Sequence, residues 1–252
     1  MQTSSDKEEV IKIKKAAVRK INNMLESYIS ADEESNLKKV QLISKWLTDF
    51  SNYVMFEDKF EASRNIAYKR GDIVKVNFGF NIGSELGGVH YAIVIDNCNK
   101  HNANTVTVVP LSSYKPGKAL YDRDLYIGSE FYALVDSRNA RLYNEAKEKF
   151  REQKQTIAVL KRHTADADAS ELLTHLIKQA EELDRKIKFL NKCNAELSLM
   201  KSGSIVKIEQ IRTISKMRIL DPKKTHDVLY GIHLSDATMD KINEKIKELF
   251  LR

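Results

Sequence analysis

A glycine-rich segment in the first half of the chain brings together groups that can contact a ligand closely. In the run NIGSELGGVH the glycines surround a serine and a glutamate: Gly83, Gly87, Gly88, Ser84 and Glu85. Because glycine has no Cβ, the backbone here can bend sharply and approach a bound molecule. The run ends on His90, whose imidazole can act as an acid or a base near neutral pH. The segment therefore predicts a ligand-contacting loop, although an ordinary connection between strands has the same composition.

A pair of polar residues in the last quarter of the chain can also serve one ligand. Gln210 and Arg212 lie two positions apart in the run EQIRTIS. If this run is a strand, the two side chains point to the same face, because side chains alternate along a strand. Together they can contact a ligand, but Arg212 can equally pair with Glu209 or with a carboxylate of a partner chain.

The cysteines and the remaining histidines give no metal-binding pattern. Cys98 and Cys193 lie far apart, and the histidines other than His90 share no common spacing. We therefore expect reduced thiols, no metal site and no cofactor. The first residues lack an apolar signal segment, and no run approaches the roughly 18 apolar residues that a membrane span needs. We expect a soluble, cytoplasmic protein with no membrane contact.

The formal net charge of +7 is concentrated in the second half of the chain. A polyanion would be attracted to that half. Ordinary surface chemistry explains such an excess equally well, so charge alone does not decide the class of partner.

Helical periodicity surrounds the polar segments on both sides. Apolar residues at three- and four-residue steps predict two helices, one over residues 7–28 and one reaching about residue 56, so residues 1–66 form a helical hairpin. Its apolar stripes must pack on each other, on the next domain or on a second chain. A terminal helix is expected at Ser235–Phe250.

Strand patterns occupy the region between the helical segments. Runs rich in β-branched residues, at 73–78, 91–95 and 105–109, are bounded by turn residues, and a weaker run covers 120–127. Strand character returns at Ser204–Ile208. Short connections favour a compact, strongly bent sheet or small barrel.

The residues 129–201 form a long helical insertion between the strands. Leucines recur at every seventh position: Leu176, Leu183, Leu190 and Leu197. The alternate core position of these heptads holds Leu173, Ala180, Ile187 and Asn194. This pattern predicts a coiled-coil seam, and a reversal at Thr164–Asp168 makes the insertion an antiparallel hairpin.

Four runs resemble, in the same order, the core segments of PemK/MazF-type toxins from type II toxin–antitoxin pairs: RGDIVKVNF, NIGSELGGVHYAIVID, TVTVVPLSS and GSIVKIEQIRTISKMRI. The resemblance implies an α+β fold, with a small curved antiparallel sheet or SH3-like barrel built from residues 67–128 and 202–252. The helical segments 1–66 and 129–201 have no counterpart in a minimal toxin.

The resemblance implies a metal-independent, sequence-selective endoribonuclease that cuts single-stranded RNA to a cyclic phosphate and a 5′-hydroxyl. Such toxins rely on an Arg before the second strand and a Thr or Ser after the third. The family motif is Gly-Gly-Val-Arg-Pro. In this chain its last four residues read Gly88-Val89-His90-Tyr91. His90 thus takes the Arg position, and Ser112 takes the hydroxyl position.

The resemblance also suggests roles for these residues. A basic group and a hydroxyl can share proton transfer and stabilisation of the phosphorane, so we expect His90 and Ser112 to be catalytic and Glu85 to orient His90. An alternative is that His90 is structural in a toxin that has lost activity, since Arg and His are not equivalent. The expected RNA contacts are Ser84, Gly87, Gly88, Ser113, Gln210, Arg212 and Lys216.

The implied partners are single-stranded mRNA, a cognate antitoxin protein and a second copy of the chain in a homodimer. Two other functions fit the same residues. The protein can be an inactive relative that binds RNA or an antitoxin, or a structural protein whose helices build an oligomer on the toxin scaffold.

Overall fold

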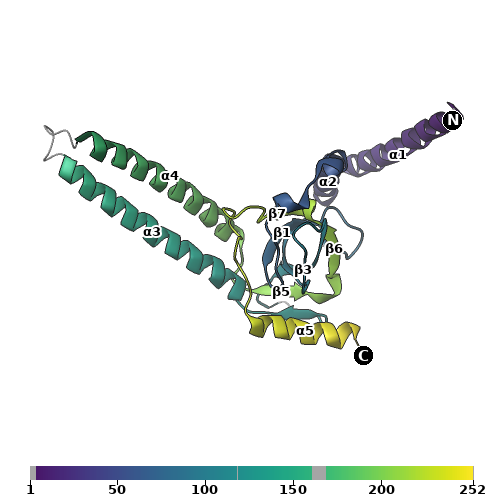
Figure 1. The fold of residues 1–252 in the computed structure, drawn as a ribbon. Helices are drawn as coiled ribbons and strands as arrows, with labels where there is room; N and C mark the ends of the chain where they lie inside the picture. The colour runs from purple at the N-terminus through teal and green to yellow at the C-terminus, as the bar shows by residue number, and fades with distance from the viewer. Residues whose placement is uncertain (1–3, 118, 161–168, 252) are drawn as a thin grey trace. The chain divides into compact units, whose positions relative to one another are not determined.

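The computed structural model describes residues 4–117, 119–160 and 169–251 (Figure 1). Contacts divide the chain into two compact units. The first unit combines residues 1–60 with the segment 79–88, and the second combines residues 61–78 with 89–252.

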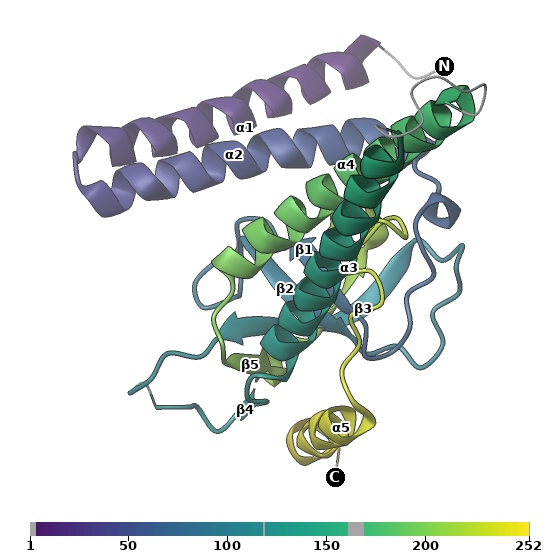
Figure 2. The same cartoon turned by 90° about the vertical axis from the view of Figure 1, so that its left-hand side faces the viewer.

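The first unit is a pair of antiparallel helices with a loop packed against one of them. Helices α1 (Ser4–Ser30) and α2 (Glu34–Phe56) lie side by side (Figure 2), and Asp32 turns the chain between them with a φ of 49°. The loop reaches α2 at Gly79, whose φ is +79°, and a Cβ built there would lie 2.6 Å from the ring of Trp46. Glycine is therefore required at this contact. The two helices predicted from the sequence are confirmed, and the bounds 1–66 of a separate helical domain stay a prediction.

The second unit contains a seven-stranded antiparallel sheet. Its strands are β1 (Ile73–Asn77), β2 (Val89–Val94), β3 (Thr105–Ser113), β4 (Asp124–Tyr126), β5 (Ser204–Lys207), β6 (Arg212–Ser215) and β7 (Ile219–Asp221). They follow the order β4-β5-β3-β2-β1-β7, and β6 also pairs with β3. The curved antiparallel sheet predicted from the sequence is confirmed, and it stays open rather than closing into a barrel.

Strand β3 changes partners along its length, which bends the sheet. Its first half pairs with β6, and its last residues, from Leu111 to Ser113, pair with β5. Pairing with β2 ends at Pro110, opposite Ala92. Since proline has no N–H to donate, the β2–β3 ladder weakens there and the two strands can separate. Short 3-10 helices lie at Glu57–Lys59, Ala62–Arg64, Ile208–Gln210 and Lys216–Arg218.

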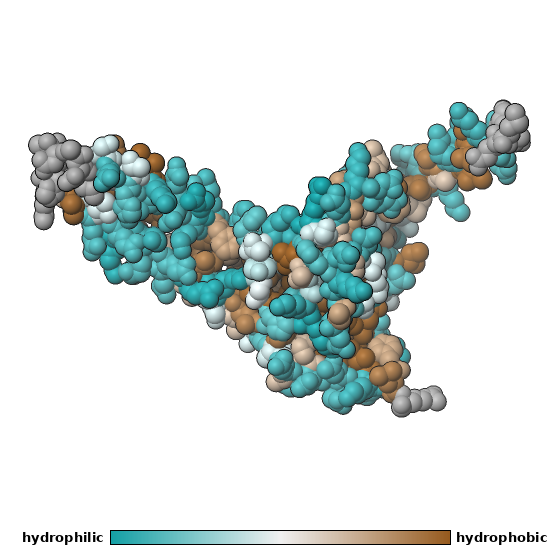
Figure 3. Space-filling model, in the orientation of Figure 1, coloured by the Kyte–Doolittle hydropathy of each residue, from teal (hydrophilic) through white to brown (hydrophobic). Residues whose placement is uncertain are grey.

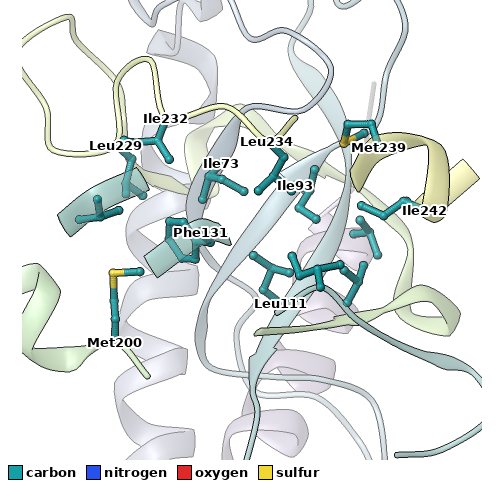
Figure 4. Close-up of a cluster of buried hydrophobic side chains, with 14 of the residues drawn as sticks. Ile73, Ile93, Leu111, Phe131, Met200, Leu229, Ile232, Leu234, Met239 and Ile242 are labelled. Carbon is teal, nitrogen blue, oxygen red and sulfur yellow. The ribbon is translucent and has the colours of Figure 1, made fainter. Parts of the chain in front are cut away.

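The main core lies between the sheet, the start of α3 (Glu130–Leu160) and the C-terminal helix α5 (Asp236–Phe250) (Figure 4). Ser235 caps α5 by accepting a hydrogen bond from the amide of Thr238 at 3.3 Å. The backbone amide of Ser235 donates to Oε1 of Glu130 at 2.6 Å, and this hydrogen bond joins the beginnings of α3 and α5. The terminal helix predicted from the sequence is confirmed.

The RGD run that opens the toxin-like region has a structural role. The guanidinium of Arg70 donates to the carbonyl of Ile95 and to the side-chain oxygen of Asn243, which holds α5 against β2. Asp72 pairs with His233 at 3.0 Å. A Cβ at Gly71 would lie 2.6 Å from the His233 ring, so a larger residue would displace it.

Helices α3 and α4 (Ala169–Leu199) form the expected antiparallel hairpin. The amide of Asn139 donates to Asn194 Oδ1 at 2.6 Å, and Lys186 Nζ lies 2.8 Å from Glu145. Hydrophilic residues cover most of the hairpin on the face that Figure 3 shows. The predicted reversal at Thr164–Asp168 lies outside the described residues.

One half of the predicted seam on α4 is wrong. Leu183 is buried, and the other seventh-residue leucines are half-buried, as expected. The alternate row is exposed, with Leu173 at 55% and Ile187 at 42%. The packed row instead lies three residues after the leucines, at Gln179, Lys186 and Cys193. Two of its members are polar, so hydrophobicity alone pointed to the neighbouring row.

Candidate functional site

A cavity of about 490 Å³ lies at the end of the sheet where β2 and β3 separate. Its walls come from β1, β2 and β3 and from the ends of α3 and α4 nearest the sheet. We call it the basic cavity because three lysines and a histidine line it, together with hydroxyl groups: Lys75, Lys115, Lys201, His90, Tyr91, Ser112, Ser113 and Ser204. Such a lining suits an anionic group.

The sheet places the expected catalytic pair in this one cavity. His90 follows the start of β2, and Ser112 precedes the end of β3. Each lies two positions beyond the paired residues Ala92 and Pro110, so the alternation of side chains puts both on the same face. Both are half-buried. The structure therefore brings together His90 and Ser112, whose chemical roles remain predictions.

A lysine of β1 is held beside the cavity by a carboxylate from the insertion. Lys75 Nζ lies 2.6 Å and 2.9 Å from the two carboxylate oxygens of Glu196 on α4. The hydroxyl of Tyr91 donates to the same carboxylate. Lys75 and Tyr91 are paired across β1 and β2, and the ammonium lies 5.7 Å from the centre of the tyrosine ring. Three groups from three elements thus form one cluster.

Burial makes this cluster less screened than a surface ion pair. The side chains of Lys75 and Glu196 are 23% and 16% exposed. Charges removed from water attract each other more strongly, but each also loses solvation, so both depend on their partner. Burial first, and then the hydrogen bond to Glu196, raises the pKa of the Tyr91 phenol well above its usual value. Tyr91 therefore stays protonated and acts as a hydrogen-bond donor.

The predicted residues of the glycine-rich loop lie in the first unit. Ser84, Glu85, Gly87 and Gly88 belong to the segment 79–88, which packs with α2, whereas His90 belongs to the second unit. The backbone amide of Gly88 donates to the Gly79 carbonyl at 2.6 Å, and the side-chain amide of Asn81 donates to the Leu86 carbonyl at 2.6 Å. These two hydrogen bonds close the loop on itself. Orientation of His90 by Glu85 remains a prediction.

Gln210 and Arg212 meet, but not in the way that the sequence suggested. The Arg212 guanidinium donates to Gln210 Oε1 at 3.0 Å. However, Gln210 lies in the 3-10 turn Ile208–Gln210 and only Arg212 lies in a strand, so the expectation of one continuous strand is wrong. The reason is that β5 and β6 pair with different halves of β3, and the chain must turn between them. Arg212 also lies 5.3 Å from the ring centre of Phe78.

The assignment of Lys216 to RNA binding is wrong. Its relative exposure is 0%, and its ammonium donates to the carbonyls of Lys100 and His101 at 3.0 Å and 3.3 Å. Burial lowers the pKa of this ammonium. Lys216 therefore fixes the loop before β3 and cannot reach a phosphate. Its position in a basic run next to a strand gave no sign of this burial.

Sequence reasoning missed the lysines of the cavity and Glu196. Lys75 carried the clearest signal, because it is the one charged residue inside the apolar run Ile73–Val76. Glu196 resembles any other surface glutamate of a helical hairpin, and 121 positions separate it from Lys75. Lys201 lies two residues after the end of α4.

Within the described ranges, no three or more His, Cys, Asp or Glu side chains cluster closely enough to hold a metal ion. Within the same residues, no helix has the length and apolar character needed to cross a membrane.

Comparison with known proteins identifies the region that carries the cavity. The model of the family described as PemK-like, MazF-like toxin of type II toxin–antitoxin system matches residues 69–142, which span β1 to β4 and the beginning of α3. This match contains His90 and Ser112 but not Glu196. No curated protein matches the chain. Over residues 69–142, the chain is therefore similar to the PemK-like, MazF-like toxins of type II toxin–antitoxin systems.

Proposed function

We propose that the protein is the toxin of a type II toxin–antitoxin pair and acts as a metal-independent, sequence-selective endoribonuclease on single-stranded RNA. The observation that carries this proposal is the basic cavity, which holds His90 and Ser112 beside lysine side chains in the region that matches the family. Lysines and a protonated histidine favour a polyanion, and an imidazole beside a hydroxyl can move protons.

The proposed reaction needs no group other than RNA and the side chains. The ribose 2′-oxygen attacks the neighbouring phosphorus, and its proton passes to a base while the new O2′–P bond forms. The P–O5′ bond breaks, and the departing 5′-oxygen receives a proton. The products are a cyclic phosphate and a 5′-hydroxyl. No electron transfer is involved, so the step is balanced by proton transfers alone.

Each cavity side chain has a task in this reaction. His90 transfers protons, which is a task that an imidazole can perform near neutral pH. The Ser112 hydroxyl donates a hydrogen bond to a non-bridging phosphate oxygen, where negative charge develops in the transition state. The exposed side chains of Lys115 and Lys201 attract the RNA backbone at the cavity.

The remaining RNA contacts follow the family resemblance and the strand geometry. Ser84, Gly87 and Gly88 offer backbone and hydroxyl groups from the loop, and Glu85 orients His90. Ser113 continues β3 beyond Ser112, and the linked pair Gln210–Arg212 supplies an amide and a guanidinium. A cognate antitoxin, a homodimer and a cytoplasmic location complete the proposal.

The test is to incubate the purified protein with a long unstructured RNA in excess chelator and to map the cut ends. We expect cuts at a repeated short motif, each leaving a cyclic phosphate. His90→Ala should lower the rate by about a hundredfold or more, as loss of an acid–base group does. His226→Ala is the matched control, because His226 is exposed and lies outside the cavity lining.

The result separates the alternatives. RNA that stays intact but binds the protein indicates an inactive RNA-binding relative. Cleavage by His90→Ala at the wild-type rate would remove His90 from the mechanism. If RNA is neither bound nor cut, the toxin scaffold serves an assembly role instead.

A further inference from the structure

The α3–α4 insertion supplies part of the cavity wall. Phe131 at the start of α3 and Leu199, Met200 and Lys201 at the end of α4 line the cavity together with the strand residues. Phe131 and Met200 also belong to the main core, and the Phe131 and Tyr91 rings meet edge to face at 4.9 Å. This end of the insertion is therefore fixed to the sheet at the candidate site.

Glu196 is the insertion residue that contacts polar groups of the sheet at this wall. It lies one helical turn before Met200, and its carboxylate accepts from Lys75 and Tyr91. We infer that Glu196 is a positioning residue of the site: it holds the Lys75 ammonium at the cavity as a permanent positive charge that acts on the scissile phosphate. This inference rests on the proposed function and extends it to a residue outside the family match.

The other charged groups near Lys75 are hydrogen-bonded elsewhere. Asp221 is the cross-strand partner of Lys75 on β7, but its carboxylate accepts from the amides of Leu229 at 2.7 Å and Val228 at 3.2 Å. Arg138, on α3, donates to the carbonyls of Val228 and Tyr230. Both groups are thus bound to the segment after β7. Among the residues that the structure describes, Glu196 is the carboxylate that contacts the ammonium directly.

A permanent charge fits the sequence change at the neighbouring position. His90 stands where the family has Arg, and an imidazole loses its positive charge when it gives up its proton. A lysine ammonium, by contrast, is a positive charge that the proposed reaction does not use as a proton donor. Lys75 can therefore supply the electrostatic stabilisation of the phosphorane, which leaves His90 free to transfer protons.

The arrangement predicts opposite effects on binding and turnover. Glu196→Gln keeps an acceptor for Tyr91 but removes a negative charge beside an anionic substrate. The RNA should bind more tightly, because a repulsive charge has gone. The reaction should slow, because Lys75 is no longer held in one geometry. A merely structural glutamate would not separate KM and kcat in this way.

The test measures kcat and KM of the full-length Glu196→Gln protein on the RNA cut by the wild type, with thermal melting as a check of folding. We expect kcat to fall about tenfold or more while KM falls or stays unchanged. The control is Glu181→Gln, which alters an exposed glutamate of the same helix. Wild-type kcat in Glu196→Gln, or a loss explained by unfolding, would overturn the inference.

A second measurement is independent of cleavage. Binding of a 2′-deoxy oligonucleotide, which cannot form the cyclic phosphate, is followed against salt concentration for the wild type and Lys75→Met. Loss of one phosphate contact should reduce the slope of log K against log salt by about 0.7. An unchanged slope would overturn the role of Lys75. If the wild type cuts no RNA, the proposed function fails, and the slope still decides whether Lys75 contacts phosphate.

Discussion

The two helical hairpins contact different kinds of structure within their own units. In the first unit, α2 packs against the loop 79–88 through Trp46 and Gly79. In the second unit, α3 and α4 join the main core through Phe131 and Met200 and reach Lys75 through Glu196. An added hairpin can thus hold a loop or can supply a wall of a site, and single substitutions distinguish the two.

The largest expected effect concerns the core end of the α3–α4 hairpin. Phe131 is 2% exposed and packs in the main core, so Phe131→Ala should lower the free energy of unfolding by about 3–5 kcal/mol. Ile13 of α1 is 63% exposed, and Ile13→Ala should change the free energy of unfolding by less than about 0.5 kcal/mol. Urea unfolding of both variants measures the difference. Equal losses would show that α1 is buried by a partner in solution.

The contact between α2 and the loop gives a smaller effect. Gly79→Ala places a Cβ against the Trp46 ring in a backbone conformation that alanine disfavours, so we expect a loss of about 1–3 kcal/mol. Gly83→Ala is the matched control, since Gly83 has a φ of +60° but no atom within 4 Å of the added Cβ. Hydrogen exchange should increase in α2 and residues 79–88 for Gly79→Ala. Equal exchange in the two variants would remove the Trp46 contact as the cause.

The smallest effect lies along the α3–α4 hairpin, at the Lys186–Glu145 pair. Its side chains are 32% and 44% exposed, so Lys186→Met should cost at most about 1 kcal/mol. The hydrogen bond from Lys186 lowers the pKa of Glu145. The pair therefore stabilises the fold above the unfolded pKa of about 4.3, and this contribution disappears as the pH falls through the lower folded pKa. Unfolding at pH 7 and below pH 4 should show the difference between variant and wild type shrinking; a constant difference would contradict it.

Local patterns predicted most of the elements, because helix and strand periodicity are properties of neighbouring residues. The helices and the strands around Ile73, Tyr91 and Thr105 all followed from such patterns. The second row of α4 did not, since Lys186 packs there through its stem while its ammonium reaches Glu145. Packing against α3 determines which row of α4 is buried, and the periodicity of α4 alone contains no information about α3.

The residues of the candidate site also fall into two groups, those found by local motifs and those that only tertiary folding brings together. His90 and Ser112 could be predicted because motifs in neighbouring strands carry them. Lys216 was misassigned, because its burial depends on carbonyls of a loop more than a hundred positions away. The Lys75–Glu196 pair went unpredicted for the same reason: tertiary folding alone brings β1 and α4 together.

The central claim is that Glu196 of the insertion acts on the reaction through Lys75. A double-mutant cycle of single-turnover RNA cleavage tests it most directly, with Lys75→Met, Glu196→Gln and the double variant compared with the wild type. If both act through one ammonium, the double variant should be about as slow as Lys75→Met alone. Rate losses that multiply in the double variant would contradict the account, because the two side chains would then act independently.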